Sequence, residues 1–196
     1  QIEGVQWLLE HYNNGLGACL ADDMGLGKTL QTLSTLVAVQ EKLEVEKAEN
    51  TQLDLFGNEI PVAKEYLKAL IVLPSSLVFN WYNEARKFTP HFRRIQYVGQ
   101  DRKLLSKKLE KYDLIFTSYA VVSRDLSILE KYQFRYLILD ESHYIKNKNS
   151  KIFKAINQLQ TTHKISLSGT PIENSLDDLW SQMQFINPNI LGSYAF

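Results

Sequence analysis

The stretch "DDMGLGKT", residues 22–29, ends like a loop that binds phosphate but begins with two carboxylates. Its last five residues match the second half of the Gly-x-x-x-x-Gly-Lys-Ser/Thr phosphate-binding loop, whereas Asp22 stands where the first glycine is expected. A short apolar run precedes the stretch and a strongly helical sequence follows it. The loop amides and the helix N-terminus would therefore point at one place, where a phosphate chain is stabilised. We predict that Lys28 meets the β- and γ-phosphates and that Thr29 binds Mg²⁺.

The two aspartates need not face a phosphate. Asp22 and Asp23 follow the apolar run directly, at the point where the predicted strand ends. Short acidic side chains in such a position can accept hydrogen bonds from nearby backbone N–H groups and fix a turn. We expect this structural role for both.

Compact apolar runs alternate with polar or helical sequence along the chain, which is the pattern of a parallel sheet with crossover helices. The sequence therefore predicts an α/β fold. The six expected strands lie within residues 17–21, 69–74, 94–98, 113–118, 136–141 and 164–169. The clearest expected helices are residues 1–13, 29–40, 76–88 and 175–186.

Residues 41–65 differ from the rest of the chain. They are rich in charge, and the sequence "FGNEIP" breaks them. We interpret them as an inserted excursion, helical at first and then loose.

Length and composition fit one substantial soluble domain with a single core, since the chain has 196 residues of which 44% are hydrophobic and 22% charged. Acidic and basic residues number 22 each, so any contact with nucleic acid must come from a local patch. Residues 85–112 hold nine basic side chains against two acidic ones. This basic stretch is either a solvated face or the rim of a DNA site, and the sequence leaves both open.

The location of the protein follows from what the sequence lacks. Cys19 has no partner for an internal disulfide and is expected to be a buried thiol. The sequence shows no apolar run long enough to span a membrane and no basic-then-apolar leader, so we expect a cytoplasmic, nucleoid-associated protein or a nuclear one, with no membrane partner. Because the chain starts at Gln1 and ends without a polar tail, we also expect it to be part of a longer protein.

A second acidic pair follows the strand-like run in "YLILDESH", residues 136–143. In a nucleotide hydrolase a carboxylate at such a strand end reaches the metal, and we predict this role for Asp140. Glu141 is then placed to orient the attacking water and accept its proton. Taken alone, such a pair is more often a plain turn, and it is the phosphate-binding loop that favours the catalytic interpretation.

Three segments together resemble a known family. "DDMGLGKTLQT", "DESHYIKN" and "SLSGTPIENSLDDLW" resemble motifs one, two and three of the Swi/Snf-type ATPases, double-stranded DNA translocases of helicase superfamily two. An acidic pair before "MGLGKT" is the usual form of the loop in that family. The resemblance covers nearly the whole chain apart from the excursion. It implies a RecA-like P-loop domain over residues 1–196, with helices on both faces of the sheet, as the N-terminal lobe of a two-lobe motor.

The resemblance also implies ligands and roles: ATP as substrate, Mg²⁺ as cofactor, and double-stranded DNA, a second RecA-like lobe and a DNA-bound protein complex as partners. Gln1 would contact the adenine, and His143 would close the Asp-Glu-x-His box. Ser142 stands where alanine is more usual, a change that should be tolerated. The implied ATP-binding residues are Gln1, Asp23, Met24, Gly25, Leu26, Gly27, Lys28 and Thr29, the catalytic ones are Lys28, Asp140 and Glu141, and the metal ligands are Thr29 and Asp140. The implied coupling residues are His143, Ser168, Gly169 and Thr170.

For DNA, the resemblance points to loops that follow successive strands. Their hydroxyls, amides and one lysine suit phosphate oxygens, which position a duplex without reading its sequence. The implied DNA contacts are Pro74, Ser75, Ser76, Thr117, Ser118, Tyr119, Lys146 and Asn147. Trp81 and Tyr82 could stack on bases, but on an amphipathic helix we favour a core role.

Two other functions remain open at this point. One is an RNA helicase of the same superfamily, against which "DDMGLGKT" and "GTPIEN" argue. The other is a nucleotide-binding or protein-docking module without turnover, with the excursion at 41–65 as its docking surface. No arginine motif of the family's second lobe lies within these residues, so we expect this chain alone to be a poor ATPase.

Overall fold

A computed structural model describes residues 1–23, 25–49, 67–169, 176–188 and 190 of the protein. Within these residues six strands form one parallel sheet in the order β1-β6-β5-β2-β4-β3. Each of the six predicted strands is present, although β5 and β6 begin earlier than expected. Their bounds are β1 Ala18–Leu20, β2 Ala69–Leu73, β3 Arg94–Gln96, β4 Leu114–Ser118, β5 Gln133–Leu139 and β6 Gln160–Leu167.

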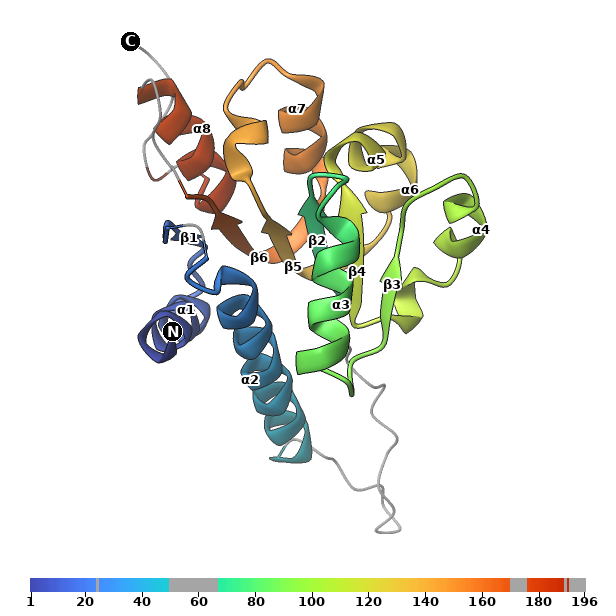
Figure 1. Cartoon of the computed structure of the whole chain (residues 1–196). Coiled ribbons are helices and arrows are strands. Elements are labelled where there is room, and N and C mark those ends of the chain that lie inside the picture. The colour runs from blue at the N-terminus through green and yellow to red at the C-terminus, as the bar shows by residue number, and fades with distance from the viewer. Residues whose placement is uncertain (24, 50–66, 170–175, 189, 191–196) are drawn as a thin grey trace, which may run out of the picture.

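Helices connect the strands and cover both faces of the sheet (Figure 1). The longer ones are α1 Ile2–Asn13, α2 Lys28–Glu49, α3 Val78–Phe88, α7 Lys151–Gln158 and α8 Leu176–Ile186. The shorter ones are α4 Arg102–Ser106, α5 Tyr119–Arg124, α6 Leu126–Leu129 and the 3-10 turns η1 Leu109–Lys111 and η2 Ser142–Ile145.

Two apolar clusters, one on each face of the sheet, form the core. Helices α1, α2 and α3 pack in the first cluster, and α5, α6, α7 and α8 pack in the second. The central strand β2 is buried along its whole length and divides its side chains between them, with Ile71 in the first cluster and Leu70 and Val72 in the second. Such a strand has no polar face, so it appears in sequence as an unbroken apolar run. The predicted α/β fold with helices on both faces is confirmed.

The register of the parallel strands determines what lies at their carboxyl ends. Leu20 of β1 pairs with Leu167 of β6, and Leu139 of β5 pairs with Ser166 of β6. On the other side of β5, Leu139 pairs with Val72 of β2. The segments that follow β1, β2, β5 and β6 therefore all leave the sheet on the same side, at the carboxyl ends of the strands.

The excursion begins later than the sequence indicated. Helix α2 continues to Glu49, and Leu43 is buried while its charged neighbours are exposed. Residues 41–49 therefore belong to helix α2, and within residues 41–46 Leu43 packs in the first core cluster while the other side chains are exposed. Residues 50–65, the rest of the predicted excursion, lie outside the described residues.

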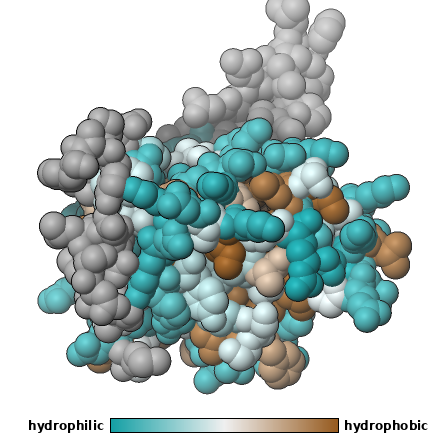
Figure 2. Space-filling view, turned by 90° about the horizontal axis from the view of Figure 1, so that it is seen from above, coloured by the Kyte–Doolittle hydropathy of each residue, from teal (hydrophilic) through white to brown (hydrophobic). Residues whose placement is uncertain are grey.

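The surface is mixed in character. In the part of the chain that the structure describes, no helix combines the length and apolar character needed to cross a membrane. Hydrophilic side chains dominate the face seen from above, where apolar side chains form small separate patches (Figure 2). Scattered apolar side chains of this kind are normal on a folded protein.

A buried ion pair joins β3 and α4 to the second core cluster. The Arg102 guanidinium donates to the Asp125 carboxylate from Nε at 2.7 Å and from Nη2 at 3.0 Å. The Tyr97 hydroxyl donates to the same carboxylate at 3.1 Å, and the side chain of Asp125 is only 3% exposed. Burial raises the pKa of Asp125, but the hydrogen bonds from Arg102 and Tyr97 outweigh burial and hold the pKa below its ordinary value.

This ion pair gives a stability prediction. Asp125→Ala leaves the Arg102 charge without its buried partner, so we expect a loss of about 3–5 kcal/mol in the free energy of unfolding at pH 7. A carboxylate with a lowered pKa contributes stability above its ordinary pKa of about 4 and loses it as the pH falls toward the lowered value. The difference between variant and wild type, measured by urea unfolding, should therefore narrow as the pH falls below about 4. Asp101→Ala removes an exposed carboxylate and serves as the control; equal unfolding midpoints for the two variants would contradict the prediction.

Candidate functional site

The loop between β1 and α2 depends on two glycines. Gly25 has a φ of 86° and Gly27 a φ of 80°, which side-chain-bearing residues rarely adopt. A Cβ atom on Gly27 would also lie 2.5 Å from Nε2 of Gln1. That same nitrogen donates to the carbonyl oxygen of Leu26 at 3.3 Å, so Gln1 lies directly against the loop. Met24, a predicted ATP-binding residue, lies outside the described residues.

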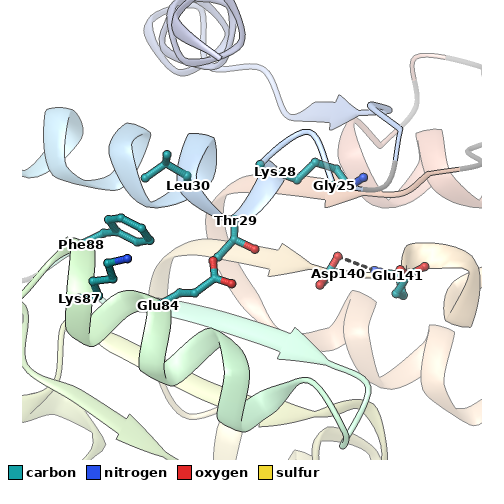
Figure 3. Close-up of a pocket in the computed structure, with 10 residues that line it drawn as sticks. Gly25, Lys28, Thr29, Leu30, Glu84, Lys87, Phe88, Asp140 and Glu141 are labelled. Atoms are coloured by element: carbon teal, nitrogen blue, oxygen red, sulfur yellow. Dashed lines mark hydrogen bonds between the residues drawn. The ribbon is translucent and has the colours of Figure 1, made fainter.

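Lys28 is bound by its own loop. Its ammonium donates to the carbonyl oxygens of Asp22 at 2.7 Å and Asp23 at 3.1 Å. The side chain therefore folds back along the loop toward Gly25 (Figure 3). This lysine is half-buried and tied to the backbone, in contrast to a solvated residue at a helix start.

The carboxylate of Asp22 is directed at helix α2. Its Oδ2 atom accepts a hydrogen bond of 3.0 Å from Nε2 of Gln31, which also donates to the Leu26 carbonyl at 3.3 Å. Gln31 is buried in the first turn of α2. Asp22 therefore fixes the loop through a side-chain amide of the following helix, where a backbone N–H was the expected donor.

The Asp140 carboxylate lies at the end of β5, and hydrogen bonds hold both of its oxygens. The indole Nε1 of Trp81 donates to Oδ2 at 2.8 Å, and the backbone N–H of Glu141 donates to Oδ1 at 3.0 Å. Asp140 is 8% exposed. Its burial raises the pKa of the carboxyl above the ordinary value, and the Glu141 charge adds to this, while the two hydrogen bonds and the Lys28 charge act in the opposite direction.

Glu141 has an unusual backbone. It adopts the left-handed conformation, with φ 50° and ψ 54°, at the start of η2. For a residue other than glycine this costs on the order of 1–3 kcal/mol, and such residues gather at functional sites. Nδ1 of His143 lies 3.3 Å from Oε2 of Glu141, so the predicted coupling residue contacts the predicted catalytic carboxylate.

The glycine loop, the start of α2, the two acids at the end of β5 and part of α3 line one open pocket of about 500 Å³, a volume usual for a small-molecule site. Thr29 from α2 and Glu84 from α3 point toward one another across it, and the two acids at the end of β5 lie beside them (Figure 3). The lining residues are Gly25, Gly27, Lys28, Thr29, Leu30, Glu84, Lys87, Phe88, Asp140 and Glu141. The structure thus brings together residues more than 110 positions apart in sequence, all of them predicted except Leu30 and the three from α3.

Of the remaining predicted ATP-binding and coupling residues, those that the structure describes do not line this pocket. Asp23 and Leu26 are exposed in the loop. Ser168 follows β6 and is buried, and its backbone N–H donates to the Leu20 carbonyl at 3.3 Å. Gly169 is half-buried beside it, and Thr170 lies outside the described residues.

Ser142 has a clear structural role. Its hydroxyl donates to Oε1 of Gln182 at 3.1 Å, and the hydroxyl of Ser166 donates to the same oxygen at 2.9 Å. The half-buried thiol of Cys19 lies 3.8 Å from this atom, and burial raises the pKa of the thiol. One amide oxygen on α8 thus joins β1, β6 and the turn after β5.

The predicted DNA-contacting residues divide into two groups. Ser75 and Ser76 are exposed before α3, with Pro74 half-buried beside them, and Asn147 is exposed with Lys146 half-buried beside it. By contrast, the side chains of Thr117 and Ser118 at the end of β4, and of Tyr119 at the start of α5, are buried and bonded internally.

Thr117 donates to the Tyr97 carbonyl at 2.9 Å, the Ser118 hydroxyl caps α5, and Tyr119 donates to the Asp140 carbonyl at 2.7 Å. At most 4% of each of these residues is exposed. Their hydroxyls are satisfied inside the protein, so the predicted contact of these three residues with DNA would be made by their backbone amides.

The basic stretch at 85–112 is partly structural. Arg93 pairs with Asp113, Arg102 pairs with Asp125, and Arg94 donates to the carbonyls of Thr89 and Phe92. Its six other basic residues are exposed, namely Arg86, Lys87, Lys103, Lys107, Lys108 and Lys111.

Helix α3 supplies the part of the site that the sequence did not reveal. Trp81, Glu84 and Phe88 recur at spacings of three and four residues, which places them along one side of the helix. The core position favoured for Trp81 is confirmed by its 4% exposure. Its hydrogen bond to Asp140, 59 residues away, could not be predicted from any local sequence pattern.

Fold and loop together define a RecA-like α/β domain of the P-loop class. The chain matches the SNF2-related domain family over residues 1–196, and it belongs to that family.

Individual relatives agree with this assignment. The chain is 38% identical over 195 residues to the TATA-binding protein-associated factor MOT1 of Saccharomyces cerevisiae, covering 98% of this chain and 10% of the relative. It is 33% identical over 198 residues to the human SWI/SNF-related matrix-associated actin-dependent regulator of chromatin subfamily A member 1, covering 98% of this chain and 17% of the relative. The chain therefore spans only a small part of the length of these curated relatives.

A solved structure shows the same architecture. The Sulfolobus solfataricus SWI2/SNF2 ATPase core in complex with double-stranded DNA superposes with a TM-score of 0.79 at 42% identity, covering 98% of this chain and 36% of that one.

Proposed function

We propose that this chain is the ATP-binding first lobe of a DNA-dependent ATPase that translocates on double-stranded DNA and remodels protein–DNA complexes. One observation carries the proposal: the glycine loop with Lys28 and Thr29 and the acids Asp140 and Glu141 line the same pocket. The similarity to a structure of an ATPase core bound to double-stranded DNA supports both the substrate and the partner.

The loop would bind the phosphates of ATP. Its glycines permit close approach of the backbone, and helix α2 directs its N-terminal amides at the same point. The ammonium of Lys28 would leave the Asp22 and Asp23 carbonyls for phosphate oxygens, which form stronger, charge-assisted hydrogen bonds. Gln1, beside the loop at Leu26, would contact the adenine.

The donor set also fits Mg²⁺, which prefers oxygen ligands and is commonly held by one or two protein groups together with substrate phosphates. The Asp140 carboxylate uses one acceptor position of each oxygen for Trp81 and Glu141, so each oxygen retains a further lone pair. The Thr29 hydroxyl lines the same pocket. Bound there, the ion would neutralise charge on the β- and γ-phosphates.

Glu141 would act on the attacking water. Its carboxylate lies beside the pocket, and its left-handed backbone sets the direction of the side chain independently of the strand. It would orient the water and accept its proton as the water attacks the γ-phosphorus in line with the departing ADP. His143 contacts this carboxylate, and it would couple changes at the γ-phosphate site to the rest of the lobe.

The proposed DNA contacts lie in the loops that follow the strands at the carboxyl end of the sheet. Ser75, Ser76, Lys146 and Asn147 would contact DNA phosphates, with the exposed lysines of the basic stretch as a rim. A second RecA-like lobe of the same protein would complete the site, and a DNA-bound protein complex would be the object of translocation. Such a protein works where its DNA lies, in the nucleus of a eukaryote or the cytoplasm of a prokaryote.

Turnover measurements test the proposal. The 196-residue chain alone should hydrolyse ATP slowly, because charge developing on the γ-phosphate lacks the second lobe's arginines, whose counterparts contribute roughly a thousandfold or more in other phosphoryl-transfer enzymes. The full-length protein should be active and stimulated by duplex DNA more than by RNA. Brisk DNA-stimulated turnover by the short chain would contradict the two-lobe proposal, and stronger stimulation by RNA would favour an RNA helicase.

Lys28→Ala should remove most of the affinity for ATP, because it deletes a charge-assisted contact with the phosphates. The loop also loses two hydrogen bonds to its carbonyls, so we expect a small loss of stability, about 1–2 kcal/mol. Calorimetric titration with ATP and thermal unfolding measure the two effects. Lys42→Ala, on the same helix but outside the pocket, is the control, and equal ATP affinities in the two variants would rule out the role of Lys28.

The two acids at the end of β5 should differ in their effects. In the full-length protein Glu141→Gln should keep Mg²⁺ and ATP bound while losing hydrolysis, because only the proton acceptor is removed. Asp140→Asn should weaken Mg²⁺ as well, because it removes the charge of a ligand. Titrations of Mg²⁺ and single-turnover rates separate the two, and equal losses of metal affinity would count against this division of roles.

A further inference from the structure

A buried hydrogen bond connects helix α3 to the acidic end of β5. Trp81 lies in the first turn of α3, and its indole N–H donates to Oδ2 of Asp140 over 2.8 Å. Trp81 is 4% exposed and Asp140 8% exposed, so water does not compete strongly for this bond. A hydrogen bond to an ionised acceptor in such surroundings is among the stronger ones in a protein.

Three other hydrogen bonds fix Asp140, and they act on different atoms. The Asp140 N–H donates to the Val72 carbonyl at 3.0 Å, and the Asp140 carbonyl accepts from the Tyr119 hydroxyl at 2.7 Å. Both hold the backbone. The carboxylate itself accepts a hydrogen bond from the adjacent Glu141 N–H at 3.0 Å and one from the Trp81 indole, a donor that lies 59 residues away along the chain.

The position of the indole is itself well fixed. Trp81 belongs to the first core cluster, and its neighbours Val78 and Ala85 on α3 are buried with it. A bulky ring held by packing has little freedom to move, so the direction of its N–H is constant. The indole therefore offers Oδ2 of Asp140 a hydrogen-bond donor of constant direction, beside the pocket that Asp140 shares with Thr29.

We propose that Trp81 is a positioning residue for the metal-binding carboxylate: its indole N–H holds Asp140 in the orientation that receives Mg²⁺ beside Thr29. The proposal rests on the function proposed above. Groups that hydrogen-bond to metal ligands commonly contribute tenfold to a hundredfold to metal affinity or activity. Trp81 itself touches neither metal nor nucleotide and acts only through Asp140.

A purely structural role for Trp81 makes different predictions. A buried indole N–H needs an acceptor, and in that case Asp140 would only satisfy the N–H of Trp81, without Trp81 orienting the carboxylate. Removing the N–H while keeping a ring would in that case change stability alone. Under the positioning role it changes the response of nucleotide binding to Mg²⁺.

The experiment compares Trp81→Phe with wild type in the full-length protein, by calorimetric titration of ADP at several Mg²⁺ concentrations and in EDTA. We expect the Mg²⁺-dependent gain in ADP affinity to fall tenfold or more, with the affinity in EDTA changed less than twofold. Trp7→Phe, which alters a tryptophan of α1 outside the pocket, should leave both values unchanged. Trp81→His, which returns a ring N–H, should recover part of the loss. If circular dichroism shows that Trp81→Phe is unfolded, Trp81→His is compared with wild type in its place.

Three results would overturn the proposal: an unchanged Mg²⁺ response in Trp81→Phe, an equal loss of affinity with and without Mg²⁺, or the same loss in the phenylalanine and histidine variants. Failure of the underlying function looks different. Wild-type protein would then show no ADP binding, or binding that Mg²⁺ does not strengthen, before any variant is compared.

Discussion

Parallel pairing in a fixed register is the constraint on which the rest of this structure depends. Pairing of Leu20 with Leu167, Ser166 with Leu139, and Leu139 with Val72 aligns four strands so that all end at one edge. Side-chain direction alternates along a strand, so a slip of one residue would turn Asp140 to the other face and away from the loop after β1. The burial of β2 on both faces leaves no polar side to tolerate such a slip.

The sequence predicted the sheet well because buried parallel strands carry a simple signal. A strand covered on both faces is apolar throughout, and the six apolar runs all became strands. The length of α2 was harder to predict, because a solvated helix and a solvated loop share the same charged composition. Only the burial of Leu43 distinguishes them, and burial is a property of the folded chain. The short helices α4, α5 and α6 are too brief to show a helical period of their own.

At the site, the sequence predicted the residues that belong to a local motif but not the contacts between distant segments. Glycines before a lysine, and two acids after an apolar run, each mark a position along one segment. No local pattern could show that Trp81 bonds to Asp140, or that Glu84 faces the pocket from α3. The hydroxyls of Thr117, Ser118 and Tyr119 illustrate the opposite case. In sequence a hydroxyl near a strand end looks available, and only the folded chain shows that each bonds inward.

The ammonium of Lys28, held by the Asp22 and Asp23 carbonyls, has a consequence for ligand exchange. An incoming anion would compete with two carbonyl oxygens that already accept two of the three N–H bonds of the ammonium. Such a contest selects by valence, since a polyphosphate that engages several amides at once recovers the cost, whereas a small monovalent anion does not. In the proposed ATP site, the carbonyls of Asp22 and Asp23 would therefore favour polyphosphates over small anions as ligands of this loop.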